Sequence, residues 1–173
     1  KSPVNMNFTD LATVAWARAA IQKLLTNGII VNNVNYYPNN SVSRAEFVKM
    51  TMRTLKISCA APTATPFVDT PLSAWYTIYV ACAKSKKAVS DSPDGRFYPD
   101  RSITRAEAVK IILSLQGKNP PAVAKSVFKD VTGWAVRWVN MASQDQIVRG
   151  NADGTFAPDR SLTRAEAAVI LAR

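Results

Sequence analysis

The chain has 173 residues and carries 22 lysine and arginine residues against 12 aspartate and glutamate residues, a formal net charge of +10. It contains no histidine, which excludes serine–histidine triads and histidine-ligated metal centres. It also has no run of eighteen apolar residues of the kind that spans a membrane. The charge favours an acidic polymer as partner, and on charge alone anionic glycan, nucleic acid and anionic lipid are all candidates.

An aromatic residue followed two positions later by aspartate opens three successive segments of the chain. These pairs are Phe8 and Asp10, Phe67 and Asp69, and Phe128 and Asp130. A tryptophan follows each pair, at Trp16, Trp75 and Trp134, and apolar residues recur four, five and eight positions after it. This spacing places the tryptophan and those residues on one face of a helix, so a helix is predicted to begin at each tryptophan.

A polar stretch rich in turn residues follows each predicted helix. It contains Asp94-Gly95 in the second segment and Asp153-Gly154 in the third, whereas the first segment has residues 32–37 of sequence Asn-Asn-Val-Asn-Tyr-Tyr. The acidic residues loosely resemble a calcium loop, but the glutamate that such a loop needs at its twelfth position is missing. A turn is therefore the favoured interpretation.

A second helix is predicted to begin at a Ser/Thr-Arg-Ala-Glu motif, which occurs three times at intervals of about sixty residues. Such a recurrence is typical of a tandem array. A hydroxyl residue with glutamate three positions later forms a capping box, in which each side chain binds the other residue's backbone N–H. We assign this helix-capping and groove-supporting role to six residues: Ser43, Glu46, Thr104, Glu107, Thr163 and Glu166.

The arginine of the motif does not fit a capping role. Arg44, Arg105 and Arg164 each occupy the first helical position, where the helix dipole disfavours a cation. A guanidinium beside unpaired N–H groups at a helix start is predicted to bind a carboxylate or phosphate, and the alternative is a solvated arginine chosen for helix propensity. On this argument Arg105→Ala is expected to leave stability nearly unchanged or slightly improved.

The repeats divide the chain into residues 1–62, 63–122 and 123–173, with linkers predicted at 58–66 and 116–126. One repeat is too short to bury a core by itself, but three together can do so. We therefore expect one compact, all-α, pseudo-threefold domain of three helix-loop-helix repeats. The residues after Arg105 are apolar on more than one face, which predicts a central bundle made of the second helices.

Two cysteines, Cys59 and Cys82, are the only ones in the chain. In an extracellular protein they could form a disulfide, and two free thiols are the equally weighted alternative.

The chain resembles the S-layer homology (SLH) domain family across residues 8 to 173. The resemblance rests on four features that recur in the same order three times: the Phe-x-Asp pair, the tryptophan, the turn-rich loop and the Ser/Thr-Arg-Ala-Glu motif. That resemblance implies an extracellular, non-catalytic module without a cofactor, which anchors a larger surface protein to the prokaryotic cell wall. The implied partner is secondary cell-wall polysaccharide carrying a pyruvate ketal, with Arg44, Arg105 and Arg164 holding its carboxylate. Trp16, Trp75 and Trp134 would be core anchors or, alternatively, would edge inter-repeat grooves and stack on sugar.

Other functions remain as alternatives: a self-assembly or protein-docking module, or a peptidoglycan-binding anchor. Nucleic acid is not the favoured partner, because the basic residues are scattered rather than aligned in one stripe. The first segment departs most from the family pattern, with Ser43 in place of threonine and no Asp-Gly turn. We therefore expect the groove at Arg44 to contribute least to binding.

Overall fold

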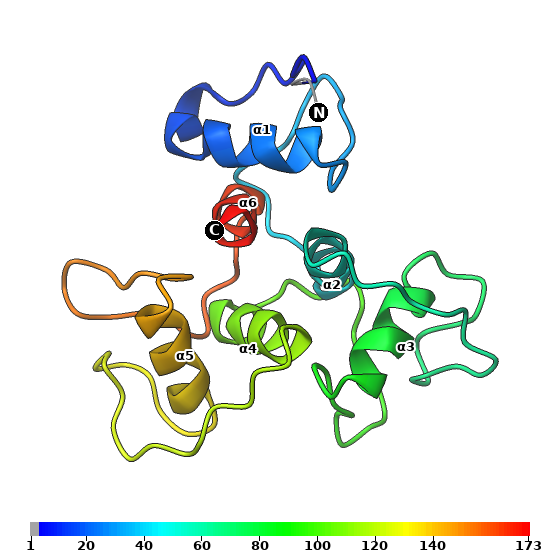
Figure 1. Cartoon of the computed structure of the whole chain (residues 1–173), viewed down its shortest axis with the longest axis vertical. Coiled ribbons are helices and arrows are strands. Elements are labelled where there is room, and N and C mark those ends of the chain that lie inside the picture. Colours follow the sequence, from blue (N-terminus) through cyan, green and yellow to red (C-terminus); the bar gives the residue numbers. More distant parts are fainter. Residues whose placement is uncertain (1–3) are drawn as a thin grey trace.

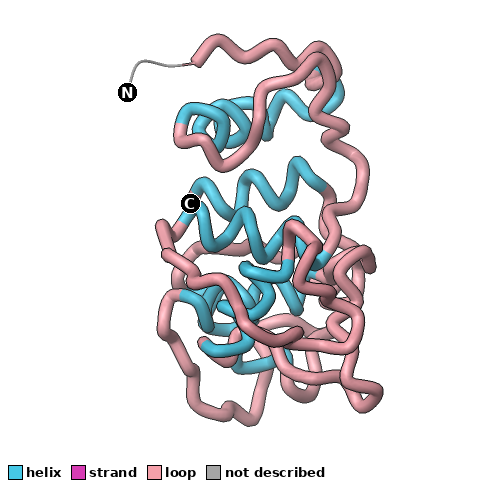
Figure 2. Tube along the Cα trace, turned by 90° about the vertical axis from the view of Figure 1, so that its right-hand side faces the viewer, coloured by secondary structure: helices cyan, strands magenta, loops and turns pink. Residues whose placement is uncertain are grey.

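The computed structural model describes residues 4–173, and within them the chain forms helices and loops but no strand (Figure 2). This confirms the mainly helical fold. Residues 1–3 of the first predicted repeat lie outside the described part. The elements are η1 (Ala12–Ala17), α1 (Arg18–Thr26), α2 (Arg44–Thr54), α3 (Thr77–Ser85), α4 (Arg105–Leu115), α5 (Ala135–Gln144) and α6 (Arg164–Ala172).

Helices α2, α4 and α6 occupy the centre of the molecule, and α1, α3 and α5 surround them (Figure 1). All three central helices begin at the predicted capping boxes, and both hydrogen bonds of each box are present. The apolar residues of α4 are buried on several faces, among them Val109, Ile111 and Leu113. This burial explains why the sequence of α4 shows no single apolar stripe. No helix of the described residues is long and apolar enough to cross a membrane.

Each outer helix packs mainly against the central helix of another repeat. Helix α1 packs on α6, α3 packs on α2, and α5 packs on α4 (Figure 1). The first helix of a repeat therefore covers the second helix of the preceding repeat in cyclic order. Since no outer helix covers the central helix of its own repeat, the apolar faces of all three repeats are buried only when the three assemble.

A ring of backbone hydrogen bonds joins the three repeats just before the central helices. The N–H of Val42 donates to the carbonyl of Leu162, that of Leu162 to Ile103, and that of Ile103 to Val42, over 2.9–3.0 Å. These three residues are fully buried. The ring thus satisfies buried backbone groups that would otherwise cost free energy, and it sets the distances between the capping boxes.

The aspartate of each opening pair fixes the loop of its own repeat. Its carboxylate accepts hydrogen bonds from two successive backbone N–H groups, at Phe97 and Tyr98 in the case of Asp69, over 2.8 and 2.7 Å. Asp10 and Asp130 make the equivalent contacts. The second of the two residues bound by each aspartate has a positive φ of 57–60°. This conformation is unfavourable for a residue with a side chain, and the hydrogen bond to the aspartate stabilises it. These residues are Tyr37, Tyr98 and Ala157.

The prediction that the tryptophans anchor the core is wrong. Trp16, Trp75 and Trp134 are 61%, 52% and 54% exposed. Helices α1 and α3 begin two residues after the tryptophan, and α5 begins one residue after it. The tryptophan therefore lies before the α-helix and not at its first position, where the sequence placed it. Residues five and eight positions further on are buried as predicted, for example Ile21 and Leu24 in α1.

Cys59 and Cys82 form a disulfide, with their Cα atoms 5.7 Å apart. The bond joins the loop after α2 to α3, which packs on α2. Of the two alternatives left open by the sequence, the structure therefore contains the bonded pair.

We predict that Cys59→Ser combined with Cys82→Ser lowers the free energy of unfolding by about 3 kcal/mol, because the bond closes a loop of 23 residues. Urea denaturation of the variant and of the parent, with and without a reductant, measures the effect. The reductant should bring the parent to the stability of the variant and leave the variant unchanged. Equal stability of the oxidised parent and the variant would contradict the prediction.

Candidate functional site

The three motif arginines reach across repeat boundaries to the loops of other repeats. In each case the Nε–H donates to the backbone carbonyl of an aromatic residue, and the guanidinium lies 4.5–4.8 Å from the centre of that residue's ring. The pairs, with their N–O distances, are Arg44 with Phe97 at 2.9 Å, Arg105 with Phe156 at 2.9 Å and Arg164 with Tyr36 at 2.8 Å. Each arginine is thereby held between its own helix start and a neighbouring loop.

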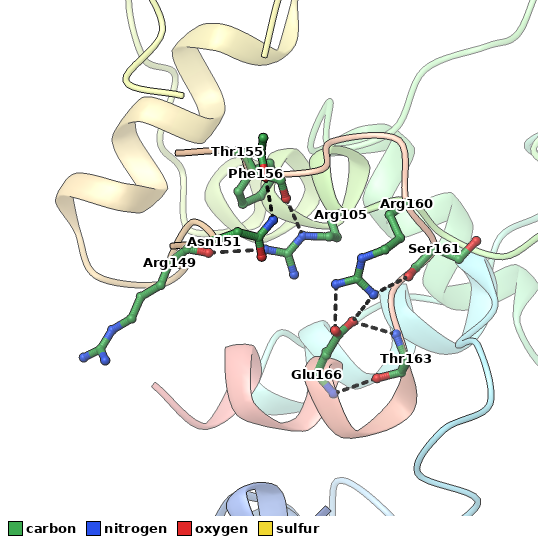
Figure 3. Close-up of polar contacts among 9 residues, drawn as sticks. All are labelled: Arg105, Arg149, Asn151, Thr155, Phe156, Arg160, Ser161, Thr163 and Glu166. Atoms are coloured by element: carbon green, nitrogen blue, oxygen red, sulfur yellow. Dashed lines mark hydrogen bonds and ion pairs between the residues drawn. The ribbon is translucent and has the colours of Figure 1, made fainter. Parts of the chain in front are cut away.

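The Arg105 site, drawn in Figure 3, is the most enclosed of the three. The Arg105 side chain extends from the start of α4 to the loop of the third repeat, and the residue is only 9% exposed. Besides the contact with Phe156, its Nη2 donates to the carbonyl of Arg149 over 3.3 Å. This burial lowers the pKa of the guanidinium, because it removes the charge from water.

The prediction of unpaired N–H groups beside these arginines is wrong. The N–H of Arg44 donates to Arg101, and that of the following residue, Ala45, donates to Pro99, over 2.9 and 3.0 Å. The same two contacts recur at the starts of α4 and α6. The N–H of Glu46, at the third helical position, donates to the hydroxyl oxygen of Ser43. The loop of the next repeat therefore occupies the helix start, and only the arginine side chain remains to meet an anion.

Carboxylates of the capping boxes lie beside two of the three arginines. Glu107 pairs with Arg44 over 3.1 Å, and Glu46 pairs with Arg164 over 3.5 Å. Glu166 instead binds Arg160 through both of its oxygens, over 2.7 and 3.3 Å (Figure 3). Each glutamate therefore has two functions, as a helix cap and as a partner of an arginine.

Arg101 and Arg160 are site residues that the sequence analysis missed. Arg101 binds one oxygen of Glu107, and Arg160 binds both oxygens of Glu166. Both arginines stand three residues before the capping threonine, and this repeated spacing could have identified them. The first repeat has Asn40 at the equivalent position.

These ion pairs shift the acid–base behaviour of the capping glutamates. Burial alone would raise the pKa of Glu107, but the hydrogen bond from Arg101 and the charge of Arg44 outweigh it, so the pKa lies below its usual value. The pKa of Glu166 is lowered in the same way, with Arg160 as the main cause opposing burial.

Burial raises the pKa of Tyr36 to about 12, against the opposing effect of Arg164.

Two of the three exposed tryptophans, Trp16 and Trp134, lie in cavities with the motif arginine of another repeat. A cavity of about 360 Å³ is lined by Arg44, Glu107 and Trp134, which come from the first, second and third repeats. A smaller cavity of about 120 Å³ is lined by Arg105, Glu166 and Trp16. The structure thus brings two of the predicted arginine–tryptophan pairs together, but never within one repeat.

Lysines on the central helices approach two of the tryptophan rings. The ammonium of Lys49 lies 4.9 Å from the ring centre of Trp75, and that of Lys110 lies 5.8 Å from the ring centre of Trp134. The equivalent residue in α6 is Val169, which lines the cavity of Trp16. The grooves therefore share a plan but differ in their charges.

The groove at Arg44 was expected to contribute least to binding because the first repeat departs most from the family pattern. The structure shows that this reasoning assigned the departure to the wrong groove. The divergent loop of the first repeat contacts Arg164 through Tyr36, whereas Arg44 contacts the Asp-Gly loop of the second repeat through Phe97. A departure of the first repeat from the family pattern therefore affects the groove at Arg164.

The SLH domain model, described as "S-layer homology domain", matches the chain three times, at residues 7–48, 66–109 and 127–168. The chain is 31% identical over 165 residues to an amylopullulanase of Thermoanaerobacterium thermosulfurigenes, covering 90% of this chain and 9% of that protein. It is 39% identical over 83 residues to a cellulosome-anchoring protein of Acetivibrio thermocellus, covering 45% of this chain and 19% of that protein. It is 27% identical over 169 residues to the surface-layer 125 kDa protein of Lysinibacillus sphaericus, covering 91% of this chain and 14% of that protein. The chain thus spans less than a fifth of the length of each of these relatives.

The contacts of Arg105 reverse the expectation that its removal is harmless. We predict that Arg105→Ala lowers the free energy of unfolding by about 2 to 4 kcal/mol, because it removes a hydrogen bond from a charged donor and the contact with the Phe156 ring. Arg18→Ala is the matched control, since Arg18 is an exposed arginine at the first position of α1. It should change stability by less than about 0.5 kcal/mol. Equal effects of the two substitutions in urea denaturation would contradict the structural role of Arg105.

The lowered pKa values of Glu107 and Glu166 predict a loss of stability in acid. A carboxyl group with a lower pKa in the folded state stabilises the fold above its unfolded pKa, near 4.5, and this stabilisation is lost as pH falls through the folded pKa. Denaturation between pH 7 and 3 at fixed ionic strength should therefore show a falling free energy of unfolding below about pH 5. Glu107→Gln should start lower at pH 7 and decline less steeply. Parallel curves for parent and variant would count against this contribution of Glu107.

Proposed function

We propose that this chain binds an anionic secondary cell-wall polysaccharide in its inter-repeat grooves. The chain belongs to the S-layer homology domain family and is an anchoring module of the cell surface. The charged group of that polymer is a carboxylate, such as the carboxylate of a pyruvate ketal, and it is bound by a motif arginine. The module is extracellular, acts without a cofactor and performs no catalysis.

The observation that carries this proposal is the composite cavity at Arg44. It places a guanidinium, a capping carboxylate and an exposed indole ring, that of Trp134, around one space of about 360 Å³. A volume of this order suits a small ligand or one part of a longer one. An indole face suits the apolar face of a sugar, and the guanidinium and carboxylate beside it suit hydrogen bonds with the hydroxyl groups of that sugar.

The guanidinium groups are positioned for recognition before any ligand arrives. The Nε of each is fixed by a loop carbonyl, and the aromatic ring beneath it restricts rotation. A ligand therefore meets a side chain that has already lost most of its conformational freedom, which lowers the entropic cost of binding. The net charge of +10 adds a long-range attraction for an acidic polymer.

The relatives are consistent with an anchoring segment. Two of the three are described as a cellulosome-anchoring protein and a surface-layer protein. The third is an amylopullulanase, but the similar segment is only 9% of its length. We infer that the segment shared with this enzyme attaches it to the surface, and that the present chain serves a larger protein in the same way.

We predict that purified cell-wall sacculi sediment this chain, and that removal of pyruvyl groups from the polymer weakens binding at least tenfold. Raised salt should weaken binding without abolishing it, because long-range attraction is screened while close contacts persist. Retention that is unaffected by removal of pyruvyl groups would indicate peptidoglycan or another modification. Failure to sediment would favour self-assembly or protein docking, and equal retention of duplex DNA would reduce the interaction to net charge.

A substitution in the cavity sharpens this test. Trp134→Ala should weaken binding several-fold, on the order of 1 kcal/mol, through loss of stacking, with little change in the melting temperature because the side chain is exposed. Val127→Ala is the matched control, since Val127 is 64% exposed and lines none of the cavities described above. Equal binding by the two variants would remove Trp134 from the site.

A further inference from the structure

The motif arginines differ in one respect that their repeated sequence conceals, namely the presence of a counter-ion. Arg44 has Glu107 at 3.1 Å and Arg164 has Glu46 at 3.5 Å. Within residues 4–173, no carboxylate lies within 4.0 Å of the Arg105 guanidinium. Yet Arg105 is the most buried of the three, and a buried charge without a partner is costly.

The pairing of Glu166 differs from that of the other capping glutamates. Glu166 lies in the same cavity as Arg105, but both of its oxygens bind Arg160 (Figure 3). In the second repeat, Glu107 binds Arg101 through one oxygen and Arg44 through the other. In the first repeat, Asn40 replaces the competing arginine, and Glu46 pairs with Arg164.

One edge of the Arg105 guanidinium is open to the cavity. Its Nε and Nη2 bind carbonyl groups, whereas Nη1 has no hydrogen-bond partner among the described residues. Every fully buried side-chain nitrogen and oxygen in that part of the chain does have a partner, so Nη1 must reach solvent. Figure 3 shows this end of the side chain pointing away from Phe156 and Arg149.

The surrounding cavity is cationic and small. Arg149 and Arg173 line it together with Arg105, and its one lining carboxylate, Glu166, is already paired. Its volume of about 120 Å³ suits a carboxylate-bearing substituent better than a whole sugar ring. Trp16 at its edge offers a face for the sugar that carries the substituent.

We propose that the three arginine sites are not equivalent: the Arg105 site alone binds a ligand carboxylate as its missing counter-ion, whereas the Arg44 and Arg164 sites, whose guanidinium groups already pair with Glu107 and Glu46, bind uncharged parts of the glycan. This inference rests on the proposed binding of an anionic glycan. It specifies which groove recognises the carboxylate of the ligand. It attributes the difference between the grooves to the arginine with which each capping glutamate pairs.

The test uses a methyl glycoside carrying a pyruvate ketal, as the free acid and as its uncharged methyl ester. Binding is followed by NMR at the indole N–H signals of Trp16, Trp75 and Trp134, each assigned with a tryptophan-to-phenylalanine variant. Trp16 should respond to the acid with at least tenfold higher affinity than to the ester. Trp134, which lines the Arg44 cavity, should respond to acid and ester alike. A similar preference for the acid at Trp16 and Trp134 would overturn the proposal.

Two substitutions separate the sites further. Arg105→Lys should abolish the preference for the acid at Trp16, because lysine lacks the planar guanidinium whose Nε and Nη2 bind carbonyl groups while Nη1 faces the cavity. Arg44→Lys should weaken acid and ester equally at Trp134. Glu107→Gln should create a preference for the acid at Trp134, because it removes the counter-ion of Arg44. A folded Glu107→Gln protein, verified by circular dichroism, without that preference would contradict the proposal, as would loss of the preference at Trp16 in Arg44→Lys.

The experiments with sacculi and with the probes together distinguish failure of the proposed function from failure of this inference. Pyruvate-dependent sedimentation combined with equal preference at Trp16 and Trp134 would retain the proposed function and reject the inequality of the sites. Absence of sedimentation would reject both.

Discussion

The structure depends on one constraint: the start of each central helix is completed by the loop of the next repeat. The first two backbone N–H groups of α2, α4 and α6 donate to carbonyls of that loop, and the motif arginine binds the same loop through its side chain. An isolated repeat would leave these donors and the apolar face of its central helix exposed. The fold is therefore specified by contacts between repeats rather than within them, and the grooves follow directly from those contacts.

The same constraint reconciles the structural and functional roles of the arginines. Binding through Nε uses one part of the guanidinium, while at least one terminal nitrogen remains for a carboxylate, whether from a capping glutamate or from a ligand. Stability and recognition thus use different atoms of one side chain. This division explains how a cation can persist at a helix start that the dipole disfavours, since the Phe156 ring and carbonyl offset that penalty at Arg105.

The sequence predicted what is local and periodic. The capping boxes, the starts of the central helices and the buried character of α4 were all correct, because each depends on residues close together in the chain. The sequence left open whether Trp16, Trp75 and Trp134 are core anchors or groove-edge residues, because helical spacing cannot reveal that the helix begins after the tryptophan. The loop that each motif arginine contacts could not be predicted either. A repeated sequence identifies equivalent positions, but it does not tell which repeats contact one another.

Divergence among the repeats has its main consequence at the position three residues before the capping residue. Asn40, Arg101 and Arg160 occupy this position, and they leave Glu46, Glu107 and Glu166 with one, two and one arginine partners. Because these glutamates also cap the central helices, their positions are fixed and only their pairing can vary. Small differences in that pairing decide whether a motif arginine carries a protein counter-ion. A pseudo-symmetric scaffold can in this way present chemically different grooves while its helices and its ring of backbone hydrogen bonds stay the same.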